Sequence, residues 1–80
     1  MPMQPDTQNF NLSTMDILSR LEGRVQRRLN GRLREFRLLL RDHGLVLRGH
    51  TRTYHAKQLA QHAVMEEVPL PIRANEIEVI

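Results

Sequence analysis

The sequence predicts a small α+β domain of αββαβ order, in which a three-stranded sheet has two helices packed on one face. Residues 33–49 contain two segments of alternating apolar residues around a short turn, which is the pattern of a β-hairpin. Segments with helical apolar spacing lie on both sides of it, and an alternating segment ends the sequence. Because 80 residues can bury one modest core, we expect a flexible tail over residues 1–12 and a single domain over 13–80.

The first helix is predicted to begin at Ser13 or Thr14, since a hydroxyl at the N-cap accepts a bond from a free backbone N–H. The preceding residues are rich in Pro, Gln, Asn and Asp, which is typical of a mobile terminus. Asn30-Gly31 ends the helix, because both residues tolerate the left-handed conformation. The apolar positions are spaced by three and four: Leu18, Leu21, Val25 and Leu29.

The hairpin follows, with Asp42-His43-Gly44 as its turn. We expect Gly44 to adopt a positive φ, which costs glycine little because it has no Cβ. On the first strand, one face holds Phe36, Leu38 and Leu40, and the other holds Arg37, Leu39 and Arg41. The return strand alternates in the same way from Leu45 to Gly49.

A second helix is predicted over residues 51–67, with Thr51 as its N-cap. Its apolar positions fit one buried face: Ala56, Leu59, Ala60, Ala63 and Val64. Pro69 and Pro71 prevent the helix from continuing, and residues 75–80 form the last strand. A right-handed crossover over the first strand would make that strand the central one, in agreement with its apolar run of three leucines.

Composition limits the classes of function. The sequence has no cysteine, so it has neither disulfides nor a thiolate metal site. The net charge of +3 comes almost wholly from arginine, which favours an anionic partner without requiring one. No segment is apolar enough to span a bilayer, and the first residues do not form a signal peptide. We therefore expect a cytoplasmic protein, or a periplasmic one if the chain was cut from a longer precursor.

Two groups of arginines are candidate binding surfaces. The first lies on the first helix, where near-whole-turn spacing aligns Arg20, Arg24 and Arg27, with Arg28 beside them and Arg32 nearby. Such a stripe can contact phosphate groups of lipids or nucleic acid, or it can simply be a solvated helix face.

The second group lies on the open sheet face, where Arg37, Arg41 and Arg48 are expected to share a surface with three glutamates, Glu35, Glu76 and Glu78. Cross-strand charge pairing explains this set without a ligand. The same face can also serve as a docking surface for a protein partner or a second copy of the chain.

The sequence shows no catalytic or cofactor site. The four histidines are His43, His50, His55 and His62, and none has the spacing of a metal-binding pair. Tyr54 and the serines have no partner arranged for nucleophilic catalysis. No glycine-rich phosphate loop is present. We therefore predict no enzyme activity, no metal and no cofactor.

Residues 33–79 resemble a BON domain, the module named for bacterial osmotic-shock and nodulation proteins. The resemblance depends on the run Asp42-His43-Gly44-Leu45-Val46-Leu47-Arg48-Gly49, where the family has a turn glycine, a V-x-L pair and a second glycine. It extends to the alanine-rich helix around Lys57, Ala60 and Ala63 and to the closing Asn75-Glu76-Ile77-Glu78-Val79. Pro69-Leu70-Pro71-Ile72 departs from the Gly-Val that is usual before the last strand.

The resemblance implies a bacterial αββαβ binding module, often periplasmic, that attaches to phospholipid surfaces or to proteins and has no catalytic activity. Together with the residues themselves, it predicts a non-catalytic module for a protein partner or an anionic phospholipid surface. The alternative is a small basic nucleic-acid-binding domain, although no aromatic side chain interleaves with the arginines to stack a base.

Overall fold

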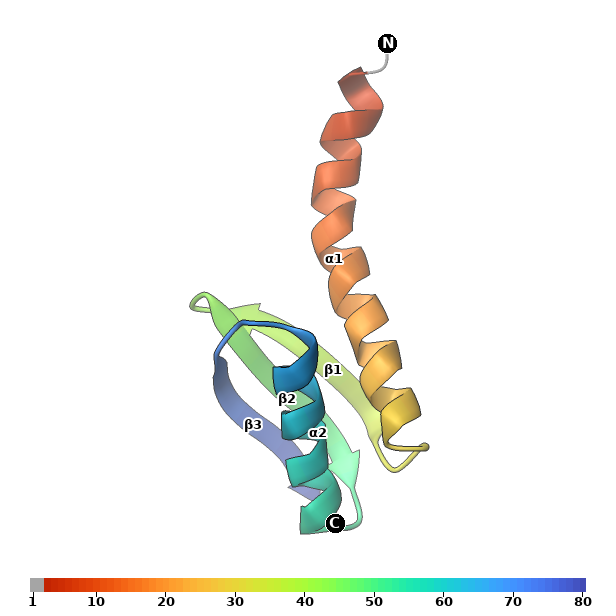
Figure 1. The fold of residues 1–80 in the computed structure, drawn as a ribbon, viewed down its shortest axis with the longest axis vertical. Coiled ribbons are helices and arrows are strands. Elements are labelled where there is room, and N and C mark those ends of the chain that lie inside the picture. Colours follow the sequence, from red (N-terminus) through yellow and green to blue (C-terminus); the bar gives the residue numbers. More distant parts are fainter. Residues whose placement is uncertain (1–2) are drawn as a thin grey trace.

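The computed structural model describes residues 3–80, with side chains from residue 14 onward. It confirms the predicted α+β fold and the element order αββαβ (Figure 1). The elements are α1 (Met3–Arg28), β1 (Arg34–Arg41), β2 (Gly44–Thr51), α2 (Tyr54–Glu67) and β3 (Ile72–Val79). The first half of α1 projects beyond the sheet, which makes the molecule 51 Å long and 25 Å by 20 Å across (Figure 1).

The strand order in the sheet is β1-β2-β3, with β1 antiparallel and β3 parallel to β2. The prediction that the first strand is central is therefore wrong. The crossover through α2 places β3 beside β2 and does not pass over β1. Burial agrees with this order, because β2 buries Leu45 and Leu47 on the helix side and Val46 on the other face. A strand that is paired on both edges and has buried residues on both faces is the natural centre of a sheet.

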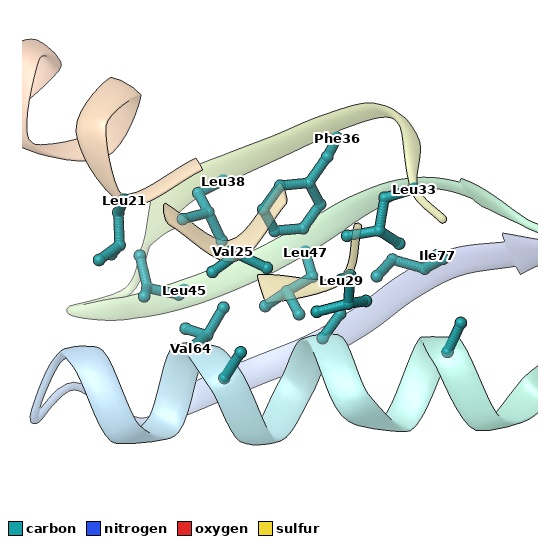
Figure 2. Packing of buried hydrophobic residues seen from close by; sticks show 13 residues of the cluster. Leu21, Val25, Leu29, Leu33, Phe36, Leu38, Leu45, Leu47, Val64 and Ile77 are labelled. Carbon is teal, nitrogen blue, oxygen red and sulfur yellow. The ribbon is translucent and has the colours of Figure 1, made fainter. Parts of the chain in front are cut away.

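Both helices cover one face of the sheet and enclose the core (Figure 2). From α1 come Leu21 and Val25, Leu29 follows directly after the helix, and all three belong to one cluster with Leu38 of β1 and Leu47 of β2. From α2 come three alanines and a valine, which make a flat face that can lie close to the strands. Burying each large apolar side chain contributes about 1.5–3 kcal/mol, so this layer provides most of the stability.

The start of α1 differs from the prediction, because the helix begins at Met3 and not at Ser13 or Thr14. The predicted tail is thus helical from Met3, while Met1 and Pro2 lie outside the described residues. Pro5 is compatible with this start, because the first helical turn does not need its N–H. None of the described helices is long and apolar enough to cross a membrane.

The helix ends show which turn predictions were correct. Asn30 and Gly31 follow α1 with φ values of 52° and 76°, as expected for a left-handed helix end. The N-cap of α2 is Thr53, whose Oγ1 accepts a hydrogen bond from the Ala56 N–H at 3.0 Å. The predicted cap, Thr51, is wrong because Thr51 still belongs to β2. The last strand begins at Ile72, three residues earlier than predicted.

The hairpin turn has positive φ at Asp42 (50°) and His43 (61°), the backbone signature of a type I′ turn. The prediction of a positive φ at Gly44 is wrong, because Gly44 is already the first residue of β2. A glycine is needed there for space. A Cβ at this position would lie 2.7 Å from the carbonyl oxygen of Pro71 and 2.8 Å from the Arg73 side chain.

Candidate functional site

The predicted arginine stripe on α1 is divided by ion pairs. Arg20 contacts Asp16, one helical turn earlier, at 2.9 Å. Arg24 and Arg28 instead reach across to α2, where Arg24 contacts Glu67 at 3.2 Å and Arg28 contacts both Glu66 and Glu67. Arg27 is exposed and has no ion pair among residues 14–80. Two of the four predicted stripe residues therefore join the helices, and the stripe is not a continuous free surface.

The contact between Arg28 and Glu66 has an electrostatic signature. A side-chain hydrogen bond from Arg28, with the charge attraction that accompanies it, lowers the pKa of the Glu66 carboxyl. The same contact raises the pKa of the Arg28 guanidinium. Both shifts favour the charged forms, as a surface ion pair with a direct hydrogen bond requires.

The open sheet face pairs most of its charges. Arg48 Nε lies 2.9 Å from Glu76 Oε1, which is one of the predicted cross-strand pairs. Glu35 and Glu78 contact His50, each at 3.4 Å and on opposite ring nitrogens. These residues line a shallow hollow of about 810 Å³, so the lining carries charges of both signs. This arrangement leaves little net charge to attract an ionic ligand.

The other predicted residues of this face are two arginines of β1, of which Arg37 also lines the hollow. Arg37 and Arg41 are exposed on β1, and neither has an ion pair within the described side chains. The histidines are dispersed over the turn, β2 and α2, and residues 14–80 hold no group of three or more His, Cys, Asp or Glu side chains placed to bind a metal ion.

A third group of arginines lines a cleft of about 630 Å³, and only one of them, Arg32, was noted from the sequence, near the stripe on the first helix. Arg32, Arg34 and Arg52 contribute the charge, and no Asp or Glu is among the lining residues. The cleft lies at the end of the domain opposite the hairpin turn, where β1 and α2 begin and β2 and β3 end. We call it the basic cleft, and its remaining lining is Gly31, His50, Thr51, Thr53, His55 and Ile80.

Hydrogen bonds fix the segments that carry these arginines. The buried Thr51 hydroxyl donates to the Arg32 carbonyl oxygen at 2.9 Å, which joins the α1–β1 loop to the end of β2. The Ile80 N–H donates to the Thr51 carbonyl oxygen at 2.9 Å and holds the end of β3 at the same place. The backbone of the basic cleft is therefore tied together at Thr51, before any ligand is present.

A β-bulge determines the direction of Arg34. The register pairs Arg34 with His50 and Arg37 with Arg48, so that Glu35 and Phe36 together oppose the single residue Gly49. Directly paired residues of antiparallel strands share a face, so Arg34 lies on the open face with His50. Simple alternation would have placed Arg34 on the buried face with Phe36. The bulge therefore brings a guanidinium group to the basic cleft.

The bulge requires two unusual backbone conformations. Glu35 has a φ of 53°, which is uncommon for a residue with a side chain, and Gly49 has a φ of 151°. A Cβ at Gly49 would also lie 3.0 Å from the Arg34 carbonyl oxygen. The sequence did contain a signal for this feature, because Leu33 and Phe36 are both apolar and three residues apart, which breaks the strand alternation.

The electrostatics of the basic cleft favour an anion. None of its three arginines has an ion pair among residues 14–80. Three guanidinium groups around one hollow repel each other, and an anion between them replaces repulsion by attraction. Helix α2 also begins here, and its first turn carries no acidic side chain. The partial positive charge at the N-terminus of the helix is therefore not neutralised.

Comparisons of the chain with protein-family models, with curated proteins and with solved structures found no match. The resemblance to BON domains therefore stays a prediction made from the order and spacing of short motifs.

Proposed function

We propose that this domain is a non-catalytic binding module that attaches to an anionic phospholipid surface through the basic cleft. The observation that supports this is the gathering of Arg32, Arg34 and Arg52 from three separate segments at one end of the domain, with no acidic residue in the lining. Each basic side chain near an anionic membrane contributes about 1 kcal/mol. Three of them supply a useful part of a reversible surface interaction.

The same end of the domain offers limited apolar contact. Tyr54 and Ile80 are exposed by 63% and 75%, and both belong to segments that border the basic cleft. Tyrosine is suited to the membrane–water interface, because its ring is apolar and its hydroxyl is polar. Attachment should therefore be peripheral and should weaken as salt screens the arginines.

The test is co-sedimentation with vesicles of phosphatidylglycerol and phosphatidylcholine, compared with vesicles of phosphatidylcholine alone. The parent should bind the anionic vesicles at low salt and be released at high salt. The triple variant R32Q/R34Q/R52Q should bind roughly two orders of magnitude more weakly, from about 1 kcal/mol for each lost charge.

The matched control is the triple variant R27Q/R37Q/R41Q, which removes the same charge from exposed arginines without described ion pairs. It should retain most of the binding. Equal losses in both triple variants would assign the effect to net charge and not to the basic cleft. No binding by the parent at low salt would end the lipid proposal.

A second candidate function is attachment to a protein partner at the hairpin end of the domain. Leu40 follows Leu38 on the helix-covered side of β1, yet it is 50% exposed and does not belong to the core cluster. Met15 and Ile17 of α1 are also exposed. The simplest occupant is a second copy of the chain, so sedimentation equilibrium of the parent and of Leu40→Glu is the test. A monomer at all concentrations would argue against it.

Nucleic acid remains the alternative partner for the basic cleft. Tyr54 is the one exposed aromatic among the described side chains, whereas sequence-independent binding of single strands usually stacks several bases. Binding of a random oligonucleotide that exceeds binding to anionic vesicles at the same salt concentration would favour this alternative over the lipid surface.

A further inference from the structure

The basic cleft is a site with a defined donor arrangement, which distinguishes it from a diffuse charged patch. Its three arginines come from the α1–β1 loop, the first residue of β1 and the β2–α2 loop. Around them, the Thr51 hydroxyl joins the α1–β1 loop to the end of β2, and the Thr51 carbonyl oxygen holds the end of β3. The three arginines therefore line one hollow from two stretches of the chain, the start of β1 with the loop before it and the β2–α2 loop.

The position of Arg34 adds an independent reason to regard the cleft as a binding site. Its direction depends on a bulge in which Glu35 has a φ of 53°. Residues with side chains in this region cost of order 1 kcal/mol, and such strain tends to gather at functional sites. The strained backbone here has a visible consequence, since it places one more guanidinium group beside His50 at the cleft.

The donor set fits one kind of anion better than others. A guanidinium group binds two oxygens of one phosphate in a planar fork, and three such groups can surround a single phosphorus centre. A terminal phosphate monoester offers three free oxygens and a charge near −2 at neutral pH. A phosphodiester offers two free oxygens and one charge, and its two ester arms limit how deeply it can enter a hollow.

We propose that the basic cleft binds a terminal phosphate monoester, either on a lipid headgroup or on a free small molecule. The cleft volume of about 630 Å³ lies within the usual range for small-molecule sites. This inference rests on the proposed function in its lipid form, for which it names the headgroup chemistry. If the ligand is a free small molecule, the inference does not require membrane attachment.

The first experiment uses soluble ligands. Glycerol 3-phosphate, a monoester, and glycerophosphoglycerol, a diester, are titrated separately into the isotope-labelled protein while backbone amide signals are recorded. The monoester should shift the amides of residues 31–34 and 50–55 saturably, with an affinity at least about tenfold above that of the diester. Equal affinities, or shifts spread over the whole surface, would overturn the inference.

Variants test the donors. Arg34→Gln and Arg52→Gln should each weaken monoester binding about tenfold, while Arg37→Gln, on the same strand as Arg34 but outside the cleft, should leave it unchanged. Amide spectra without ligand check that each variant is folded. Arg52 lies in a loop, so its variant tests the cleft even if Arg34→Gln disturbs the bulge. An equal effect of Arg37→Gln would overturn the assignment.

The second experiment identifies the source of the phosphate. Vesicles containing phosphatidic acid, a monoester, are compared with vesicles containing phosphatidylglycerol, a diester, at equal surface charge. Preference for phosphatidic acid supports a lipid monoester. Binding of free glycerol 3-phosphate without vesicle binding supports a soluble ligand and contradicts the proposed membrane attachment. Equal vesicle binding without monoester preference in solution leaves membrane attachment standing and overturns the monoester site.

Discussion

The backbone N–H of Leu38 donates a hydrogen bond to the Glu22 carboxylate, with 2.9 Å between nitrogen and oxygen. Leu38 belongs to β1, an edge strand, and Glu22 belongs to α1. The helix therefore supplies an acceptor for a donor that no neighbouring strand can pair. Since unpaired strand edges recruit other chains, this contact both stabilises β1 and reduces the risk of edge-to-edge association.

Replacing Glu22 with alanine should lower the free energy of unfolding by about 1–3 kcal/mol, because it leaves a half-buried N–H without an acceptor. Glu22→Gln keeps an oxygen at the same position and should lose less. Urea denaturation of the three proteins measures the difference. If the alanine variant were as stable as the parent, the contact would contribute nothing to the fold.

The side chain of Leu38 is also buried in the core, where Leu38 is only 3% exposed. Leu38→Ala should destabilise the domain by about 2–5 kcal/mol, through lost apolar burial and the cavity that remains. Leu40→Ala provides the matched control on the same strand, because Leu40 is half exposed and should lose less than half as much. Equal losses in chemical denaturation would place the core boundary elsewhere.

The hairpin turn predicts a stabilising substitution. His43 has a φ of 61°, whereas Asp-Gly is the favoured pair for a turn with two positive φ values. His43→Gly should therefore raise the free energy of unfolding by roughly 0.5–1 kcal/mol, after the greater entropy of glycine in the unfolded chain is subtracted.

Gly44→Ala is the contrasting change, because the added Cβ would meet the Pro71 carbonyl oxygen and should cost about 1–3 kcal/mol. Thermal melts of the two variants should therefore move in opposite directions. A destabilised His43→Gly together with an unaffected Gly44→Ala would contradict both the positive φ at His43 and the close packing at Gly44.

The element order was predictable because each segment has its own apolar period, and these periods do not depend on distant residues. The strand order was not, since the leucine run of residues 38–40 suggested a central strand. In the fold, Leu38 is covered by α1, Leu40 is half exposed, and β2 takes the centre. An apolar run in one strand shows that the strand is buried, but it does not show whether another strand pairs with each of its edges.

The surfaces were harder to predict than the fold. Near-whole-turn spacing aligned Arg20, Arg24 and Arg27 correctly on one helix, but it could not show that Glu67, 43 residues away from Arg24, lies opposite. The basic cleft was missed because its arginines are dispersed in sequence and because the bulge reverses the expected direction of Arg34. Local periodicity carries no information about either relationship.

The ion pair between Arg28 and Glu66 predicts a pH dependence of stability. The pKa of Glu66 is lowered in the folded state from its ordinary value of 4.5, mainly by the hydrogen bond from Arg28. The contribution is thus fully present above that value and is lost as the pH falls through the lowered folded-state pKa. Because both side chains are exposed, the effect should be small and should shrink with added salt.

Glu66→Gln isolates this contribution. The difference in urea midpoint between the parent and Glu66→Gln should be constant from neutral pH down to about pH 5 and should decrease toward zero at more acidic pH. Glu76→Gln, which breaks the separate pair with Arg48, controls for general acid effects. A difference that stays the same down to the acid limit would show that Glu66 acts through packing and not through its charge.

The bulge opposite Gly49 supports the last prediction. Glu35→Gly removes a side chain from a position with a φ of 53° and should stabilise the domain by up to about 1 kcal/mol, with the bulge kept. Gly49→Ala should destabilise it by about 1–3 kcal/mol, since φ is 151° and the Cβ would lie 3.0 Å from the Arg34 carbonyl oxygen.

The two variants also separate stability from cleft geometry. Amide signals of residues 31–34 and 50–53 should change little in Glu35→Gly, because Arg34 keeps its pairing with His50. They should change strongly in Gly49→Ala, because a strand without the bulge would turn Arg34 toward the side of the sheet that holds Phe36. Unchanged signals in a folded Gly49→Ala would show that the bulge does not determine where Arg34 points.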